Sequence, residues 1–129
     1  MNLEIRAEGG ILEVVATGKF TLEKAKRAFV QMVEAVADHG TGKVVLDGRE
    51  ILGNPETIER FLYSEFAAQT VAAYVHRGVA RATRFAYVLK PPVLDPERFG
   101  ETVAVNRGMN VKAFDDPEEA LRWLGVADR

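Results

Sequence analysis

The stretch Val44–Phe61, "VVLDGREILGNPETIERF", decides the fold. Residues 43–47 carry a short, nearly continuous apolar run, which is typical of a strand covered by helices on both faces, so we expect this strand to be central. A polar connection follows Asp47. Asn54 then offers a helix N-cap, and Pro55 suits the first helical position, where a missing N–H costs nothing. The stretch therefore predicts a central strand that leads through a turn into a helix.

The helix expected to begin at Pro55 runs to about Arg77 and is stopped by Gly78. It is apolar nearly all round, because between residues 61 and 75 the only formal charge is Glu65. One apolar stripe is expected to pack on the sheet. A second apolar group, roughly on the other side, must be buried under the rest of the chain, around an apolar ligand or against another subunit, and we favour the subunit interface. The stripe comprises Ile58, Phe61, Leu62, Phe66, Ala72 and Ala73, and the second group, a candidate dimer or pocket face, comprises Tyr63, Ala67, Val71 and Tyr74.

The residues before this stretch predict a hairpin and a helix. Apolar residues alternate with charged ones over 3–7, Gly9-Gly10 supply the positive φ values of a tight turn, and β-prone residues resume over 11–17. Thr21 then offers an N-cap, apolar residues recur at helical spacing, and Gly40 ends the pattern.

The residues after the stretch predict two further strand–helix units. Residues 85–89 are β-prone, and a short helix is expected from about Pro96 to Asn106. Residues 110–114 give a last strand, and Asp116 caps a last helix that ends at Gly125. The order is β-β-α-β-α-β-α-β-α. It predicts one α/β domain over 1–129, with a mixed central sheet of about five strands and about four helices.

Composition excludes several functional classes. The 129 residues contain no cysteine, which removes disulfides and thiolate chemistry and is typical of a reducing compartment, so we expect a cytoplasmic protein. With 17 basic and 19 acidic side chains, the chain has no general attraction to nucleic acid. We also expect no signal peptide and no membrane span, because no apolar run approaches about 18 residues.

The best candidate site lies after the central strand, where open sheets bind ligands. Asp47, Arg49 and Glu50 are candidate contacts for a ligand or partner, and Asn54 joins them at the expected helix start. The alternative is that Asp47 caps the turn and Arg49 pairs with a neighbour at the surface. Thr57 is the nearest hydroxyl to the helix start that could accept a phosphate, but a capping threonine has the same sequence.

A local excess of positive charge gives a second candidate. Arg77, Arg81 and Arg84, with His76 beside them, form either an anion-binding face or a solvated helix end.

Catalytic and metal chemistry have no pattern to support them. Ser64 is the only serine and falls inside the expected helix, where its hydroxyl is expected to bond its own backbone. His39 and His76 fall near helix C-termini, where capping is expected. No metal-ligand spacing occurs. We therefore expect no catalytic residue, no metal and no cofactor.

Three segments resemble a known family: "GKFTLEKAKRAFVQMVEAV" (18–36), "KVVLDGREILGNPETIERF" (43–61) and "FGETVAVNRGMNVKAFDDPEEALRWL" (99–124). They look like the small bacterial SpoIIAA-like proteins of the STAS and Sec14-like group. The resemblance implies a mixed-sheet α/β domain, often a homodimer, whose relatives bind protein partners such as anti-sigma kinases, nucleotides or hydrophobic ligands. It does not imply an enzyme.

The chain departs from this family's antagonist branch at one place. That branch carries a phosphorylatable serine in a D-S-[ST]-G motif before the helix, whereas the corresponding residues 52–55 contain no serine. The resemblance therefore favours a non-enzymatic regulatory module that binds a protein partner as a homodimer, without the phosphoserine switch.

The alternative is a carrier or sensor of a lipid or a small apolar or anionic ligand. In that interpretation Phe61, Phe66, Tyr74 and Tyr87 line a cavity, and the segment from Arg77 to Arg84 holds an anionic head group.

Overall fold

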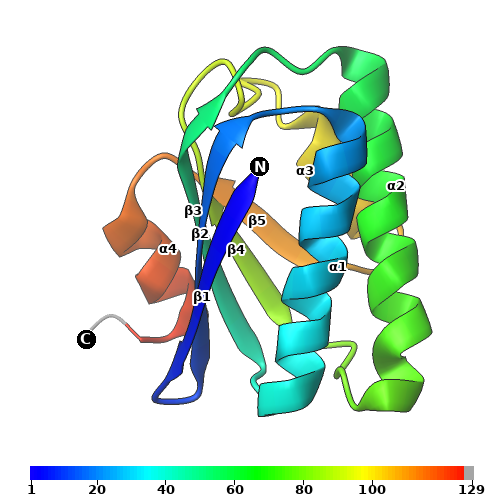
Figure 1. The fold of residues 1–129 in the computed structure, drawn as a ribbon, viewed down its shortest axis with the longest axis vertical. Helices are drawn as coiled ribbons and strands as arrows, with labels where there is room; N and C mark the ends of the chain where they lie inside the picture. Colours follow the sequence, from blue (N-terminus) through cyan, green and yellow to red (C-terminus); the bar gives the residue numbers. More distant parts are fainter. Residues whose placement is uncertain (127–129) are drawn as a thin grey trace.

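The computed structural model describes residues 1–126 and forms a single five-stranded sheet with helices on both faces (Figure 1). The strand order is β1-β2-β3-β4-β5, with β1 antiparallel to β2 and all other neighbours parallel. This confirms the expected mixed α/β sheet. The elements are β1 (Asn2–Glu8), β2 (Ile11–Lys19), α1 (Leu22–His39), β3 (Lys43–Leu52), α2 (Thr57–Ala73), the 3₁₀ helix η1 (Tyr74–Arg77), β4 (Arg84–Val88), α3 (Phe99–Asn106), β5 (Asn110–Phe114) and α4 (Pro117–Leu124).

Local signals for the hairpin and the helix caps are confirmed. Gly9 and Gly10 have φ values of 61° and 79° in the β1–β2 turn. Thr21 Oγ1 accepts a hydrogen bond from the backbone N–H of Lys24 at 3.2 Å, and Gly40 ends α1 in the left-handed conformation. At the other end of the chain, the Asp116 side chain caps α4.

The helices divide between the two faces of the sheet: α1, α2 and α3 cover one face, and α4 covers the other (Figure 1). The central strand β3 contributes to both layers. Val44 is buried in the core beneath α1 and α2, whereas Val45 packs against the smaller cluster around Leu124 of α4. A strand covered on both faces explains the short apolar run that predicted it.

Strand β3 is longer than its apolar run. The polar connection expected after Asp47 is strand up to Leu52, since residues 50–52 pair with residues 17–19 of β2 after a register shift. Gly48 lies at this irregularity, where a Cβ would lie 2.7 Å from Leu89 Cδ2 and 2.8 Å from a methyl carbon of Ile51. Backbone pairing with β2 therefore extends a strand that side-chain hydropathy alone would end.

Helix α2 begins two residues later than expected. Its N-cap is Glu56 rather than Asn54, and the backbone N–H of Glu56 donates to Glu59 Oε1 at 2.9 Å. Pro55 is therefore outside the helix, where it is buried. Glu56 at the N-cap and Glu59 in the first turn form a capping box, which takes over the capping expected from Asn54.

The expected orientation of α2 is wrong. Ala67 and Val71, at 2% and 5% exposure, belong to the core on the sheet side, and Tyr63 packs edge-on against Phe29 of α1. Ile58, expected to be buried on the sheet, is 58% exposed. The small residues bring α2 close to α1 and the sheet. The larger rings flank the contact, where Lys26 covers Phe66 and Arg107 covers Phe61.

Helix α3 begins at Phe99 instead of Pro96. Asp95 accepts hydrogen bonds from the backbone N–H groups of Glu97 and Phe99, and Arg98 adopts a left-handed conformation with φ of 53°. The Asp-Pro signal therefore marks a turn that leads into the helix.

Among residues 1–126, no helix is long and apolar enough to cross a membrane.

Candidate functional site

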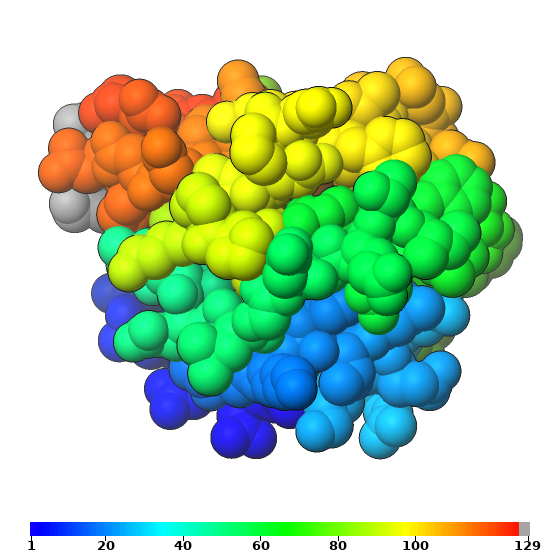
Figure 2. All heavy atoms as spheres, turned by 90° about the horizontal axis from the view of Figure 1, so that it is seen from above, coloured from blue at the N-terminus to red at the C-terminus, as the bar shows by residue number. Residues whose placement is uncertain are grey.

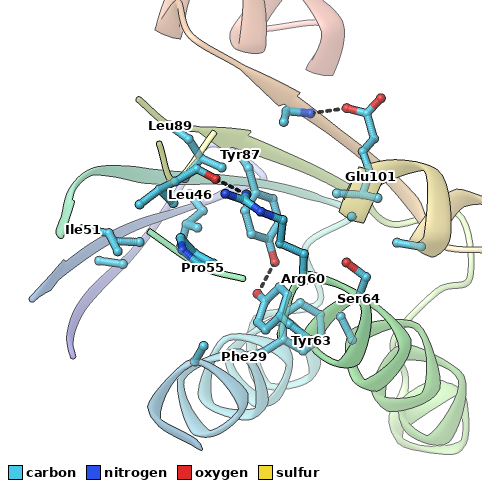
Figure 3. Close-up of a pocket in the computed structure, with 18 of the residues that line it drawn as sticks. Phe29, Leu46, Ile51, Pro55, Arg60, Tyr63, Ser64, Tyr87, Leu89 and Glu101 are labelled. Carbon is cyan, nitrogen blue, oxygen red and sulfur yellow. Dashed lines mark hydrogen bonds between the residues drawn. The ribbon is translucent and has the colours of Figure 1, made fainter. Parts of the chain in front are cut away.

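A cavity of about 160 Å³ lies between the sheet and its α1–α2 layer. Its wall is built mainly from apolar side chains of several elements: Phe29 from α1, Leu46 and Ile51 from β3, Tyr63 from α2 and Tyr87 from β4 (Figure 3). These residues are far apart in the sequence. The layered fold brings them together at the end of the sheet where the parallel strands finish, which is the usual place for ligands in open α/β sheets.

The loop after β4 closes one side of the cavity and is held by Arg60 of α2. The Arg60 guanidinium donates to the carbonyl oxygens of Val93 at 2.7 Å and Pro92 at 2.6 Å. Figure 2 looks down on this end of the molecule, where the segments after β3 and β4 lie side by side. Arg60 therefore uses two N–H groups to hold in place the loop that covers the cavity.

The charged side chains at the far edge of the cavity are also paired. Glu101 Oε1 accepts from the backbone N–H of Ala113 at 2.7 Å and from the Arg98 guanidinium at 3.3 Å, and Arg98 also donates to the Ala113 carbonyl oxygen. These contacts tie the start of α3 to β5 (Figure 3). Since both charges serve this connection, the cavity itself stays largely apolar.

Two tyrosine hydroxyls meet at the wall of the cavity. Tyr63 Oη and Tyr87 Oη lie 2.7 Å apart in a hydrogen bond that joins α2 to β4 (Figure 3). Burial raises the pKa of Tyr63 to about 12, and burial followed by the neighbouring Tyr63 raises the pKa of Tyr87 well above 10. Both phenols are therefore protonated at neutral pH and act as neutral hydrogen-bonding groups.

Ser64 adds a third hydroxyl to the lining. It is buried where α3 comes closest to α2, because a Cβ on Gly100 would lie 2.9 Å from Ser64 Oγ. The expected bond from this hydroxyl to its own helix backbone is not formed. Within residues 1–126, Ser64 Oγ has no hydrogen-bond partner, and the residue lines the cavity.

A second, more polar depression adjoins the cavity at the ends of the strands. It shares Pro55, Arg60 and Asp95 with the cavity. The candidates Asn54 and Thr57 lie in it, both exposed. The structure thus places these two sequence candidates beside the cavity and not inside it.

Asp47, Arg49 and Glu50 are not part of the cavity lining. The Arg49 guanidinium makes a two-pronged contact with Asp47, with N–O distances of 3.0 and 2.8 Å, and the Arg49 backbone N–H donates to the same carboxylate. The hydrogen bond from the Arg49 side chain holds the pKa of Asp47 below its usual value. Glu50 is exposed. Asp47 and Arg49 therefore pair with each other near the surface, as the alternative interpretation expected, and neither points to a ligand in the cavity.

The candidate anion-binding arginines do not converge. Arg77 lies over the Tyr74 ring and 4.0 Å from Glu34, near the C-terminal ends of α1 and α2. Arg84 donates to the Trp123 carbonyl oxygen at 2.8 Å, on the α4 side of the sheet. Arg81 is exposed in the intervening turn. Each guanidinium serves a different surface, which favours the solvated helix end over the anion-binding face.

The residues that line the cavity also differ from those expected from the sequence. Of Phe61, Phe66, Tyr74 and Tyr87, only Tyr87 lines the cavity. Sequence reasoning missed Phe29, Leu46, Ile51, Arg60 and Leu89, which give no local signal because each reads as an ordinary core or surface residue.

Across the described residues 1–126, no group of three or more His, Cys, Asp or Glu side chains is placed to hold a metal ion.

Comparison with known proteins assigns the family. The SpoIIAA-like family model matches residues 11–125. The chain belongs to the SpoIIAA-like family. A similar solved structure is the crystal structure of an anti-sigma factor antagonist from Mycobacterium paratuberculosis. It aligns with a TM-score of 0.59 at 15% identity and covers 96% of this chain and 93% of that one. At that identity the likeness concerns the fold. No curated protein matches the chain.

Proposed function

We propose that this SpoIIAA-like chain is a non-enzymatic binding module that holds a small apolar molecule in the cavity between the sheet and the α1–α2 layer. The observation that carries the proposal is the cavity itself, about 160 Å³ and lined mainly by apolar and aromatic side chains. An apolar cavity of about 150 Å³ takes up benzene in other proteins, so the space suits a molecule of about that size. A whole phospholipid is far too large, which narrows the lipid-carrier alternative to small ligands.

The side chains around the cavity favour binding over catalysis. Arg60, Arg98 and Glu101 are engaged in contacts that hold loops and helices in place. The two tyrosine hydroxyls have raised pKa values, which is the wrong direction for a nucleophile or a general base at neutral pH. These features support a site that retains a ligand without transforming it.

Filling the cavity from α2 tests this function. The Ala67→Leu variant places three extra carbons at a buried position in the cavity wall, so toluene is expected to stabilise the wild type and not the variant. For the wild type at ten times the dissociation constant, the expected gain is about 1.4 kcal/mol, or about 4 °C in Tm. Differential scanning fluorimetry with and without toluene measures it, and native mass spectrometry of freshly purified protein looks for a co-purified mass.

The matched control is Ala72→Leu, the same change on the exposed side of the same helix. It is expected to keep the toluene shift of the wild type. An equal shift in the Ala67→Leu variant, or no shift and no co-purified mass in the wild type, would contradict the proposal.

Regulatory protein binding is the second candidate function, and a surface beside the cavity favours it. Three exposed large apolar residues lie at or next to the ends of elements at the carboxyl end of the sheet: Leu52 at 66%, Ile58 at 58% and Phe99 at 37% exposure. Exposed apolar residues gathered at one end of a small domain mark a docking surface. Residues 52–55 contain no serine, so we propose docking without the phosphoserine switch. The structural neighbour is an anti-sigma factor antagonist, which supports a protein partner.

For the homodimer we propose this same surface in place of Tyr63, Ala67, Val71 and Tyr74, which pack within the chain's own core. Sedimentation velocity is expected to show concentration-dependent dimers of the wild type at micromolar concentration. The Ile58→Glu variant should weaken the dimer about tenfold or more, since a buried charge opposes association. Val105→Glu, at an exposed position near the other end of α3, serves as control. A wild type that stays monomeric throughout would exclude the homodimer.

A further inference from the structure

The Tyr63–Tyr87 pair has hydrogen-bonding capacity that the protein does not use. Each phenol has one proton and can also accept, but the pair is joined by a single hydrogen bond of 2.7 Å. Within residues 1–126, neither hydroxyl has another hydrogen-bond partner. One donor and several acceptor positions therefore remain at a wall that is otherwise mainly apolar.

The position of the pair makes this capacity relevant to a ligand. Tyr63 comes from α2 and Tyr87 from β4, so the two hydroxyls meet where the helix layer and the sheet face each other across the cavity (Figure 3). The Tyr63 ring is fixed edge-on against Phe29, with centroids 6.0 Å apart. A hydroxyl pair held by rigid rings offers a fixed direction for one further hydrogen bond at little entropic cost.

We propose that the tyrosine pair recognises one oxygen on the ligand, so that the cavity selects a small phenol, alcohol or carbonyl compound over the hydrocarbon of the same shape. The inference rests on the proposed ligand-binding function. It assigns the apolar wall to affinity and the two hydroxyls to specificity. Because burial keeps both phenols protonated, the pair offers its donor to a neutral oxygen throughout the physiological pH range.

The test compares toluene with p-cresol, which differ by one hydroxyl, in the wild type and in the Tyr63→Phe/Tyr87→Phe double variant. Both hydroxyls are removed because either one alone, once freed from its partner, could still bind the ligand. Replacing both with rings of the same shape is expected to be nearly neutral for folding. The matched control is Tyr74→Phe, whose hydroxyl donates to Glu34 and is not part of the cavity lining.

Dissociation constants from isothermal titration calorimetry give the readout. The double variant is expected to bind toluene as the wild type does, while the ratio of p-cresol to toluene affinity falls about tenfold, and the Tyr74→Phe variant keeps the wild-type ratio. If the wild type binds both probes and the double variant keeps its ratio, the recognition role of the pair is overturned and the cavity function stands. If the wild type binds neither probe, both proposals are overturned.

Discussion

Replacing Phe29 with alanine is expected to lower the free energy of unfolding by about 3–5 kcal/mol. Phe29 of α1 is 1% exposed, and its ring lies 5.7 Å from the Phe85 ring of β4 and 6.0 Å from the Tyr63 ring of α2. It therefore packs against both α2 and the sheet. The loss should be large because the ring already borders a cavity, so its neighbours have little tendency to close the new space.

Urea unfolding followed by Trp123 fluorescence measures the change. Phe66→Ala is the matched control, because Phe66 lies on the other side of α2, is only partly buried and is covered by the Lys26 ammonium group 5.4 Å from its ring centre. Its expected cost is about 1 kcal/mol. Similar losses in the two variants would mean that the outer side of α2 carries as much of the stability as the inner side, against the packing described.

The parts of the fold that followed from the sequence are those set by neighbouring residues. Gly9-Gly10, Thr21, Gly40 and Asp116 each act within a few positions of their own place in the chain, and each makes the predicted turn or cap. The central position of β3 could also be predicted from the sequence, since a strand covered on both faces must be apolar on both sides. The family resemblance pointed to the same mixed sheet, which the structure and the family match confirm.

The errors in the fold come from partners that are distant in sequence. Residues 50–52 lie beyond the apolar run and become strand only because β2 continues alongside them, after a register shift between Asp47 and Glu50. Helix α2 offers two apolar sides of similar character, and its neighbours select the one with Ala67 and Val71, which allows a close approach. Hydropathy ranks the two sides by apolar area, whereas packing ranks them by shape.

The candidate site was predictable in place but not in composition. The carboxyl end of the sheet was the expected location of the site, and the cavity lies at that end, between the sheet and the helices. Asp47 and Arg49 drew attention as charged residues after a strand, yet they satisfy each other. The tyrosine pair joins residues 24 positions apart and could be found only after α2 was oriented correctly. The site is built by contacts between residues of different layers, and such contacts leave no periodic pattern in the sequence.

Truncating Leu124 to alanine is expected to cost about 2–5 kcal/mol and to leave ligand binding unchanged. Leu124 is 0% exposed and fills the smaller core on the α4 face of the sheet, with Ile11, Val88 and Phe114. The cavity is on the opposite face. Urea unfolding gives the stability change, and calorimetry with toluene gives the affinity, which should stay within about twofold of the wild type because distant sites act independently.

Leu121→Ala controls for the change in helix composition. Leu121 lies in the same helix, before the same Gly125 cap, but is only partly buried, so its expected cost is about 1 kcal/mol. Comparison with Phe29→Ala separates the two layers, since that substitution alters stability and cavity together. If Leu124→Ala lowers toluene affinity about tenfold while the protein stays folded, the two faces of the sheet are coupled and α4 takes part in ligand binding. An unchanged affinity assigns α4 to stability and the α1–α2 layer to the ligand.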